Sequence, residues 1–170
     1  MKKHSGMRPQ DIVILLKIAT LKDHHWLMKD IAYGLFISAS EVSESINRSL
    51  VASLIASDKK TLMKEALLEF LQYGIKYTYP QRPGPITRGI ATAFSTTPLS
   101  QMIDSIEPVV WPYVEGDIRG QAIEPLHPSV PKACLHDPGL YELLALTDAL
   151  RIGKVREQEY AINALRERIC

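Results

Sequence analysis

Apolar side chains recur at helical spacing along the first 74 residues of the chain and predict a run of helices. Between residues 9 and 21, Leu15 and Leu16 follow Ile12 by three and four positions, which places the three side chains on one helix face. Pro9 suits the first turn of that helix, where no backbone bond needs its missing N–H. The same spacing predicts helices over residues 9–21, 28–35, 39–55 and 59–73, the last ending at Gly74.

After Gly74 the pattern changes from helical to extended. Ten of the eleven prolines lie between Pro80 and Pro138, and proline is excluded from helix interiors and central strands. β-Branched and aromatic residues at 75–79 predict a strand, and a second strand is expected after the turn PQRPGP. The predicted extended segments are 75–79, 86–95, a hairpin of 109–114 and 118–123, and a proline-rich stretch over 124–136.

Helical spacing returns in the C-terminal segment. Asp137 as N-cap and Pro138 in the first turn start one helix, and Gly153 separates it from a charged amphipathic helix over 154–169. The predicted fold class is therefore α+β, with an N-terminal winged-helix-like helix-turn-helix domain, a proline-rich β-hairpin and a C-terminal helical extension. The predicted boundaries are 1–74, 75–136 and 137–170, and the three parts could pack as one compact unit.

Residues 27–54 indicate a helix-turn-helix. A short helix ends near Leu35, Phe36-Ile37 forms a tight link, and a second helix opens at Ser38. Ser38 and Glu41 have the spacing of a capping box, in which each side chain accepts from the other's backbone N–H. The second helix, about 39–55, carries one apolar stripe, so its other face is free for a partner.

Polar side chains on that second face are candidates for reading DNA in the major groove. Arg48 suits guanine or a phosphate, Asn47 suits adenine, and Glu44 could accept from cytosine. Lys29 could contact the DNA backbone, and Arg82 and Arg88 could do so if residues 75–95 form a wing. The candidate DNA-binding residues are Lys29, Ser38, Ser40, Ser43, Glu44, Asn47, Arg48, Arg82 and Arg88.

The segment ISASEVS, residues 37–43, resembles the turn and recognition-helix start of MarR-type winged-helix regulators. Blocks at 67–80, 86–95, 124–133 and 137–154 resemble an uncharacterised bacterial family labelled MarR-like or winged-helix DNA-binding. The resemblance implies a bacterial origin and a DNA-binding role, and it implies no catalytic residue. Phe36 occupies the position at which such turns often have a glycine. A positive φ there would cost a phenylalanine about 1 kcal/mol, so the turn is expected to be built differently.

Charge and composition fit a soluble protein with a modest positive surplus near the helix-turn-helix. The net charge is only +1, but residues 1–60 hold nine Lys or Arg against six Asp or Glu. Two cysteines in separate segments favour a reducing cytoplasm over a disulfide-bonded protein. No apolar run reaches the roughly 18 residues of a membrane span, so no membrane role is expected.

Motifs for other chemistry are weak in this chain. His127, Cys134 and His136 are suitable zinc ligands by type, but their spacing is not the one found where hairpins supply zinc ligands in pairs. Neither a phosphate-binding glycine loop nor a Gly-x-Ser-x-Gly elbow occurs. We therefore expect no enzyme activity, no metal and no cofactor.

The sequence thus predicts a cytoplasmic homodimer that binds double-stranded DNA as a bacterial transcription regulator. The alternative is a protein–protein adaptor or antitoxin-like partner that uses the winged-helix fold without reading DNA, since near-neutral charge suits protein docking. A third reading is a ligand-sensing regulator, with Trp111, Tyr113 and Tyr141 lining a pocket between the two halves.

Overall fold

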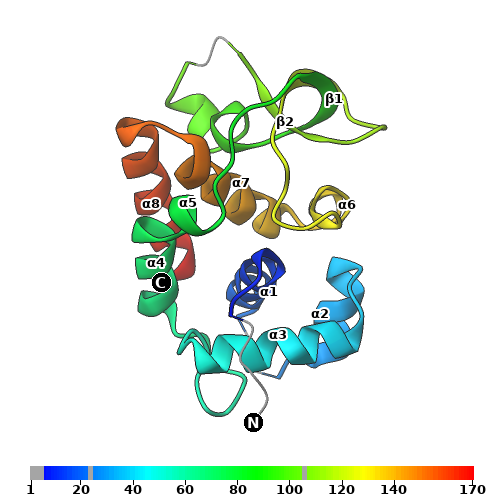
Figure 1. Ribbon diagram of the computed structural model, residues 1–170, viewed down its shortest axis with the longest axis vertical. Coiled ribbons are helices and arrows are strands. Elements are labelled where there is room, and N and C mark those ends of the chain that lie inside the picture. The colour runs from blue at the N-terminus through cyan, green and yellow to red at the C-terminus, as the bar shows by residue number, and fades with distance from the viewer. Residues whose placement is uncertain (1–5, 23–24, 105–106) are drawn as a thin grey trace.

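Helix α1 (Pro9–Thr20) lies at the centre of the computed structural model, which describes residues 6–22, 25–104 and 107–170 (Figure 1). Helices α2 (Met28–Leu35) and α3 (Ala39–Val51) pack on one side of it and α7 (Pro138–Ile152) on the other. All five consecutive side chains from Ile12 to Leu16 have no exposed surface. Because neighbours on a helix point 100° apart, five buried in a row mean that every face of α1 is covered.

A buried ion pair joins α1 to α3. The Arg48 Nε and Nη2 atoms donate to the two carboxylate oxygens of Asp11, at 2.8 and 2.7 Å. Asp11 is fully buried and Arg48 is 8% exposed. The two-point geometry aligns the planar groups of both side chains, so the pair sets the rotation of α3 against α1.

A short hairpin follows α3, where the sequence pattern predicted the end of one helix, 39–55, and the start of the next, 59–73. The segment 54–63, called hairpin 54–63 below, is closed by a bridge between Ile55 and Leu62. Helix α3 ends at Val51 rather than at residue 55, because Ser53 takes a positive φ of 61° and reverses the chain. Helix α4 (Lys64–Tyr73) therefore begins five residues later than predicted from the pattern over 59–73.

Residues 75–79 do not form the predicted strand. Helix α5 (Ile75–Thr78) continues directly from α4 through Gly74, and its buried Ile75 faces the core while α5 packs against α7. The β-branched and aromatic composition predicted the wrong backbone, because tertiary packing overrides strand propensity in so short a segment; Ile75 is buried, but Tyr77 and Thr78 are exposed.

Three short strands close into a small barrel at one end of the molecule: β1 (Ile86–Ala91), β2 (Val109–Pro112) and β3 (Ile118–Ala122). The predicted hairpin of β2 with β3 is wrong, since these two strands pair in parallel and each also pairs antiparallel with β1. Gly89 is the β1 residue opposite both Pro112 and Ile118. A Cβ at Gly89 would overlap the Trp111 carbonyl oxygen, so this close strand approach requires glycine.

The C-terminal helices begin and end where the sequence indicated. Asp137 caps α7 by accepting from the Leu140 N–H at 3.0 Å, and Gly153 follows the last residue of that helix. Helix α8 (Val155–Ile169) packs against α7 and α4. The remaining elements are 3₁₀ turns η1 (Ala93–Ser95) and η2 (Leu99–Gln101), and α6 (Val130–Leu135), a short helix within the stretch predicted to be extended. Buried apolar side chains from all these regions form one continuous cluster.

Replacing Arg48 with alanine should destabilise the fold by about 3–5 kcal/mol, because it leaves the buried Asp11 carboxylate without its partner. Urea unfolding followed by circular dichroism measures the change. Arg82→Ala is the matched control, since Arg82 is exposed. Equal unfolding midpoints for the two variants would contradict a structural role for the pair.

Candidate nucleic-acid interface

The turn between α2 and α3 is built around a left-handed phenylalanine. Phe36 has φ 55° and ψ 39°, and the Ile37 N–H donates to the Ala32 carbonyl at 3.1 Å, which closes the end of α2. The Lys132 Nζ lies 4.2 Å from the centre of the Phe36 ring. This cation–π contact offsets part of the cost of a positive φ. The turn therefore has the positive φ usual for its first position without the usual glycine.

Ser38 starts α3 as predicted, through one of the two capping-box bonds. Its Oγ accepts from the Glu41 N–H at 3.2 Å. The reciprocal bond, in which the Ser38 N–H would donate to the Glu41 carboxylate, is not formed between these two described residues, and Ser40 Oγ lies 3.3 Å from Ser38 Oγ. One cap is enough to fix the helix start, because it satisfies one of the free N–H groups of the first turn.

One face of α3 is open to solvent and carries four of the nine predicted contact residues, namely Ser40, Ser43, Glu44 and Asn47. Its exposed positions are Ser40, Glu41, Glu44, Asn47 and Val51, while Ser43 is half-buried. The spacing of three and four residues aligns Ser40, Glu44 and Asn47 along one line of the helix. Short polar groups on such a line can approach base edges closely.

Arg48 does not belong to that face, contrary to the sequence-based hypothesis. Val42, Ser45 and Ser49 are buried on the same side as Arg48, which is bonded to Asp11. The hydrogen bond with Asp11 also raises the pKa of Arg48. A guanidinium that is committed to a buried carboxylate cannot reach a base or a phosphate without breaking the pair between α1 and α3.

Hairpin 54–63 lies directly after α3, and the sequence pattern did not reveal it. Asp58 shapes its tip: the carboxylate accepts from the Lys60 and Thr61 N–H groups at 2.8 and 2.9 Å. Lys59 is exposed there with φ 58°. The signal that could have predicted this turn is Asp58 itself, because an aspartate that bonds the backbone two and three residues ahead is typical of a turn.

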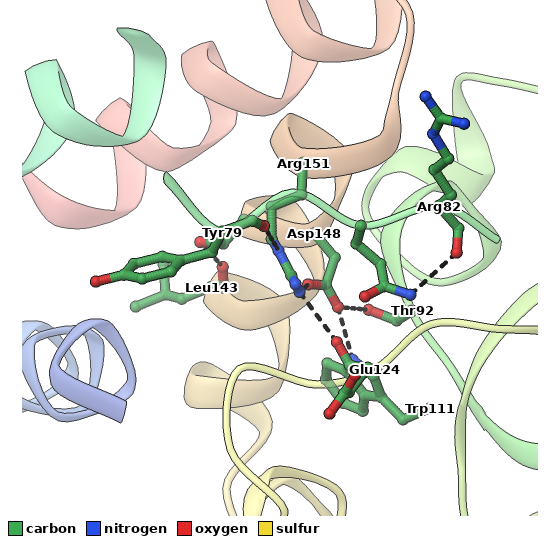
Figure 2. Close-up of polar contacts among 10 residues, drawn as sticks. Tyr79, Arg82, Thr92, Trp111, Glu124, Leu143, Asp148 and Arg151 are labelled. Carbon is green, nitrogen blue, oxygen red and sulfur yellow. Dashed lines mark hydrogen bonds and ion pairs between the residues drawn. The ribbon is translucent and has the colours of Figure 1, made fainter. Parts of the chain in front are cut away.

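Arg82 and Arg88 do not form a wing beside α3. Arg88 lies on β1 in the barrel, which Figure 1 places at the opposite end of the molecule from α3, with α1 and α7 between them. Arg82 is exposed in the segment leading to β1, and Figure 2 shows its side chain pointing away from the core. Lys29, by contrast, is exposed in the first turn of α2, at the opposite end of this helix from the turn that leads to α3.

A second buried polar cluster ties α7 to the barrel (Figure 2). One Asp148 carboxylate oxygen accepts from Thr92 Oγ1 at 2.7 Å and from Trp111 Nε1 at 2.6 Å, and the other from Arg151 at 2.9 Å. Arg151 also donates to two backbone carbonyls, those of Tyr79 and Glu124. Burial raises the pKa of Asp148. Its oxygens are occupied by internal donors, so the cluster holds segments together.

The aromatic residues expected to line a pocket between the halves are largely part of the core. Trp111 is buried, and its ring centre lies 5.6 Å from that of Tyr141. The Tyr141 hydroxyl donates to the Ala91 carbonyl. Tyr113 is half-buried.

The described residues contain no group of three His, Cys, Asp or Glu side chains placed to hold a metal ion. Within the segment considered for zinc, His127 Nδ1 lies 2.8 Å from Ser129 Oγ, and Cys134 is buried. Burial also raises the pKa of the Cys134 thiol well above its ordinary value. Cys134 packs within the main hydrophobic cluster.

Comparisons with protein-family models, with curated proteins and with solved structures found no match for this chain. Within the described part of the chain, no helix combines the length and apolar character needed to cross a bilayer.

The two thiols should differ sharply in reactivity towards Ellman's reagent in the native protein. Cys170 is exposed and should react, although partial desolvation of the thiol and its hydrogen bond to the Glu65 carboxylate raise its pKa. Cys134 should react only after unfolding in urea, because its thiolate is suppressed by burial. Two equivalents of rapid reaction without denaturant would show that the region around α6 opens.

Proposed function

We propose that this protein binds double-stranded DNA as a bacterial transcription regulator, with α3 in the major groove. The observation that supports the proposal is the order of elements: two helices joined by a tight turn, an exposed polar face on the second, and a hairpin with an exposed lysine directly after it. In a winged-helix arrangement, the hairpin contacts the DNA backbone beside the groove that the helix occupies.

Under this proposal, the exposed side chains of α3 and its neighbours have separate roles. Asn47 can make a two-point contact with adenine, and Ser40 can contact a base or phosphate near the helix start. Lys29 and Lys59 supply positive charge to the DNA backbone from α2 and from hairpin 54–63. Glu44 repels phosphates, so it lowers the affinity for DNA of arbitrary sequence. Its carboxylate can also accept a hydrogen bond from a cytosine amino group in the specific site.

A homodimer would place two copies of α3 on successive major grooves. Two half-sites about one helical turn apart require two-fold symmetry in the protein. Helix α8 is the candidate dimer element, because it carries the exposed apolar side chain of Val155. Light scattering coupled to size exclusion gives the mass of the free protein and of its DNA complex.

Asn47→Ala should weaken binding to the specific duplex by about 1–3 kcal/mol and leave binding to an unrelated duplex unchanged. Lys59→Gln should weaken both and should lower the slope of log affinity against log salt by about 1, because it removes one phosphate contact. Fluorescence anisotropy with duplexes from upstream of the protein's own gene measures both effects.

Lys76→Gln on α5 is the control, since it removes one positive charge from an element outside the helix-turn-helix. Binding that is equally affected by Lys76→Gln would indicate non-specific charge attraction. Failure of the native protein to bind either duplex at low salt would reject DNA reading altogether.

A protein-docking role is the second candidate, and one observation favours it. The helix-turn-helix exposes large apolar side chains, with Tyr33 86% exposed and Leu27, Phe36 and Val51 also accessible. Aromatic anchors of this kind are typical of the centre of protein interfaces. Glu41 and Glu44 beside them suit a basic partner, as an adaptor or antitoxin-like protein would require.

If the docking role is correct, the native protein should co-purify with one protein in a fixed ratio, and Tyr33→Ser should abolish that association. Tyr77→Ser is the matched control, because Tyr77 on α5 is similarly exposed. Loss of the partner in both variants would mean that the association does not use the helix-turn-helix surface.

A further inference from the structure

A cavity of about 550 Å³ lies between hairpin 54–63, the end of α1 and the end of α8. Its volume is within the range of sites that hold metabolite-sized ligands. The lining residues are Ile18, Ala19, Leu21, Lys22, Trp26, Lys60, Thr61, Leu62, Lys64, Arg168, Ile169 and Cys170.

One part of the lining is apolar and belongs to the core. Ile18, Trp26, Leu62 and Ile169 are buried side chains of the main hydrophobic cluster, contributed by four separate segments. Because these side chains are held by packing on their far sides, they form a firm surface and not a mobile one. Such a surface would bind the apolar or aromatic body of a ligand.

The other part of the lining is cationic, and two of its charges are held in place. Lys60 Nζ donates to the Trp26 carbonyl at 2.6 Å and lies 4.1 Å from the centre of the Trp26 ring. Arg168 Nε donates to the Glu142 carboxylate at 2.7 Å, which offsets its charge. Lys22 and Lys64 form no ion pair with the described residues.

Among the described residues, three lysines line the cavity and no carboxylate side chain does; the nearby Glu142 and Glu65 carboxylates are bonded to Arg168 and Arg166. Like charges gathered in this way repel one another, and an anion would relieve that repulsion. A monoester phosphate is close to doubly charged at neutral pH and offers three acceptor oxygens. It matches several ammonium groups better than a carboxylate with one charge does.

We propose that this cavity is a binding site for an organic phosphate, a phosphate monoester with an apolar or aromatic body. The phosphate lies among Lys22, Lys60 and Lys64, and the body packs on Trp26 and Ile169. The site does not depend on the proposed DNA binding, because its lining shares no residue with the exposed face of α3.

Isothermal titration calorimetry of the full chain with 1-naphthyl phosphate tests the proposal. Uncharged 1-naphthol and inorganic phosphate are the comparison ligands. 1-Naphthyl phosphate should bind at least ten times more tightly than either, because only it uses both parts of the lining. The double variant Lys22→Gln, Lys64→Gln should lower that affinity fivefold or more.

Lys59→Gln is the control variant, because Lys59 lies on the same hairpin and outside the cavity lining. Circular dichroism of each variant verifies that the fold is retained. The proposal is overturned if 1-naphthol binds as tightly as its phosphate, if Lys59→Gln lowers affinity as much as the double variant, or if no saturable binding occurs at millimolar ligand.

Discussion

Complete burial of α1 is the constraint on which the rest of the structure depends. A helix with five consecutive fully buried side chains has no face left for water, so other elements must surround it. Helices α2 and α3 cover one side and α7 the other, and each of these needs further partners for its own apolar surface. The helix-turn-helix is thus supported by a helix from which it cannot be separated without exposing the core.

Two buried aspartate–arginine pairs organise the core: Asp11 and Arg48 join two helices directly, whereas Asp148 and Arg151 both lie on α7 and reach distant segments through their other hydrogen bonds. Asp11 with Arg48 sets how α3 sits on α1, and Asp148 with Arg151 connects α7 to the barrel. Since α1 packs on α7, one continuous core connects α3 to the barrel, and these two elements lie at opposite ends of the molecule (Figure 1). Buried pairs of this kind add little net stability but strongly disfavour other packings in which a charge loses its partner.

The candidate interface shows how the pairing of a charge decides its role. Arg48 and Asn47 are adjacent, and both were reasonable base-reading residues from their type and helix position. Only the structure separates them, because Arg48 is turned inwards to Asp11 and Asn47 is exposed. Hairpin 54–63 adds a second element next to α3 and brings its lysines to two different places: Lys59 to solvent and Lys60 to the Trp26 carbonyl.

The sequence by itself determined the features that depend on near neighbours. The starts of α3 at Ser38 and of α7 at Asp137 and the end of α7 at Gly153 follow from bonds that span three or four residues, which sequence spacing reports directly. Tertiary structure alone decided the partner of Arg48, which lies 37 residues away, the helical form of 75–78, and the parallel pairing of β2 with β3. The physical reason is that these outcomes depend on which distant segment removes a side chain or a strand edge from water, and local periodicity does not contain that information.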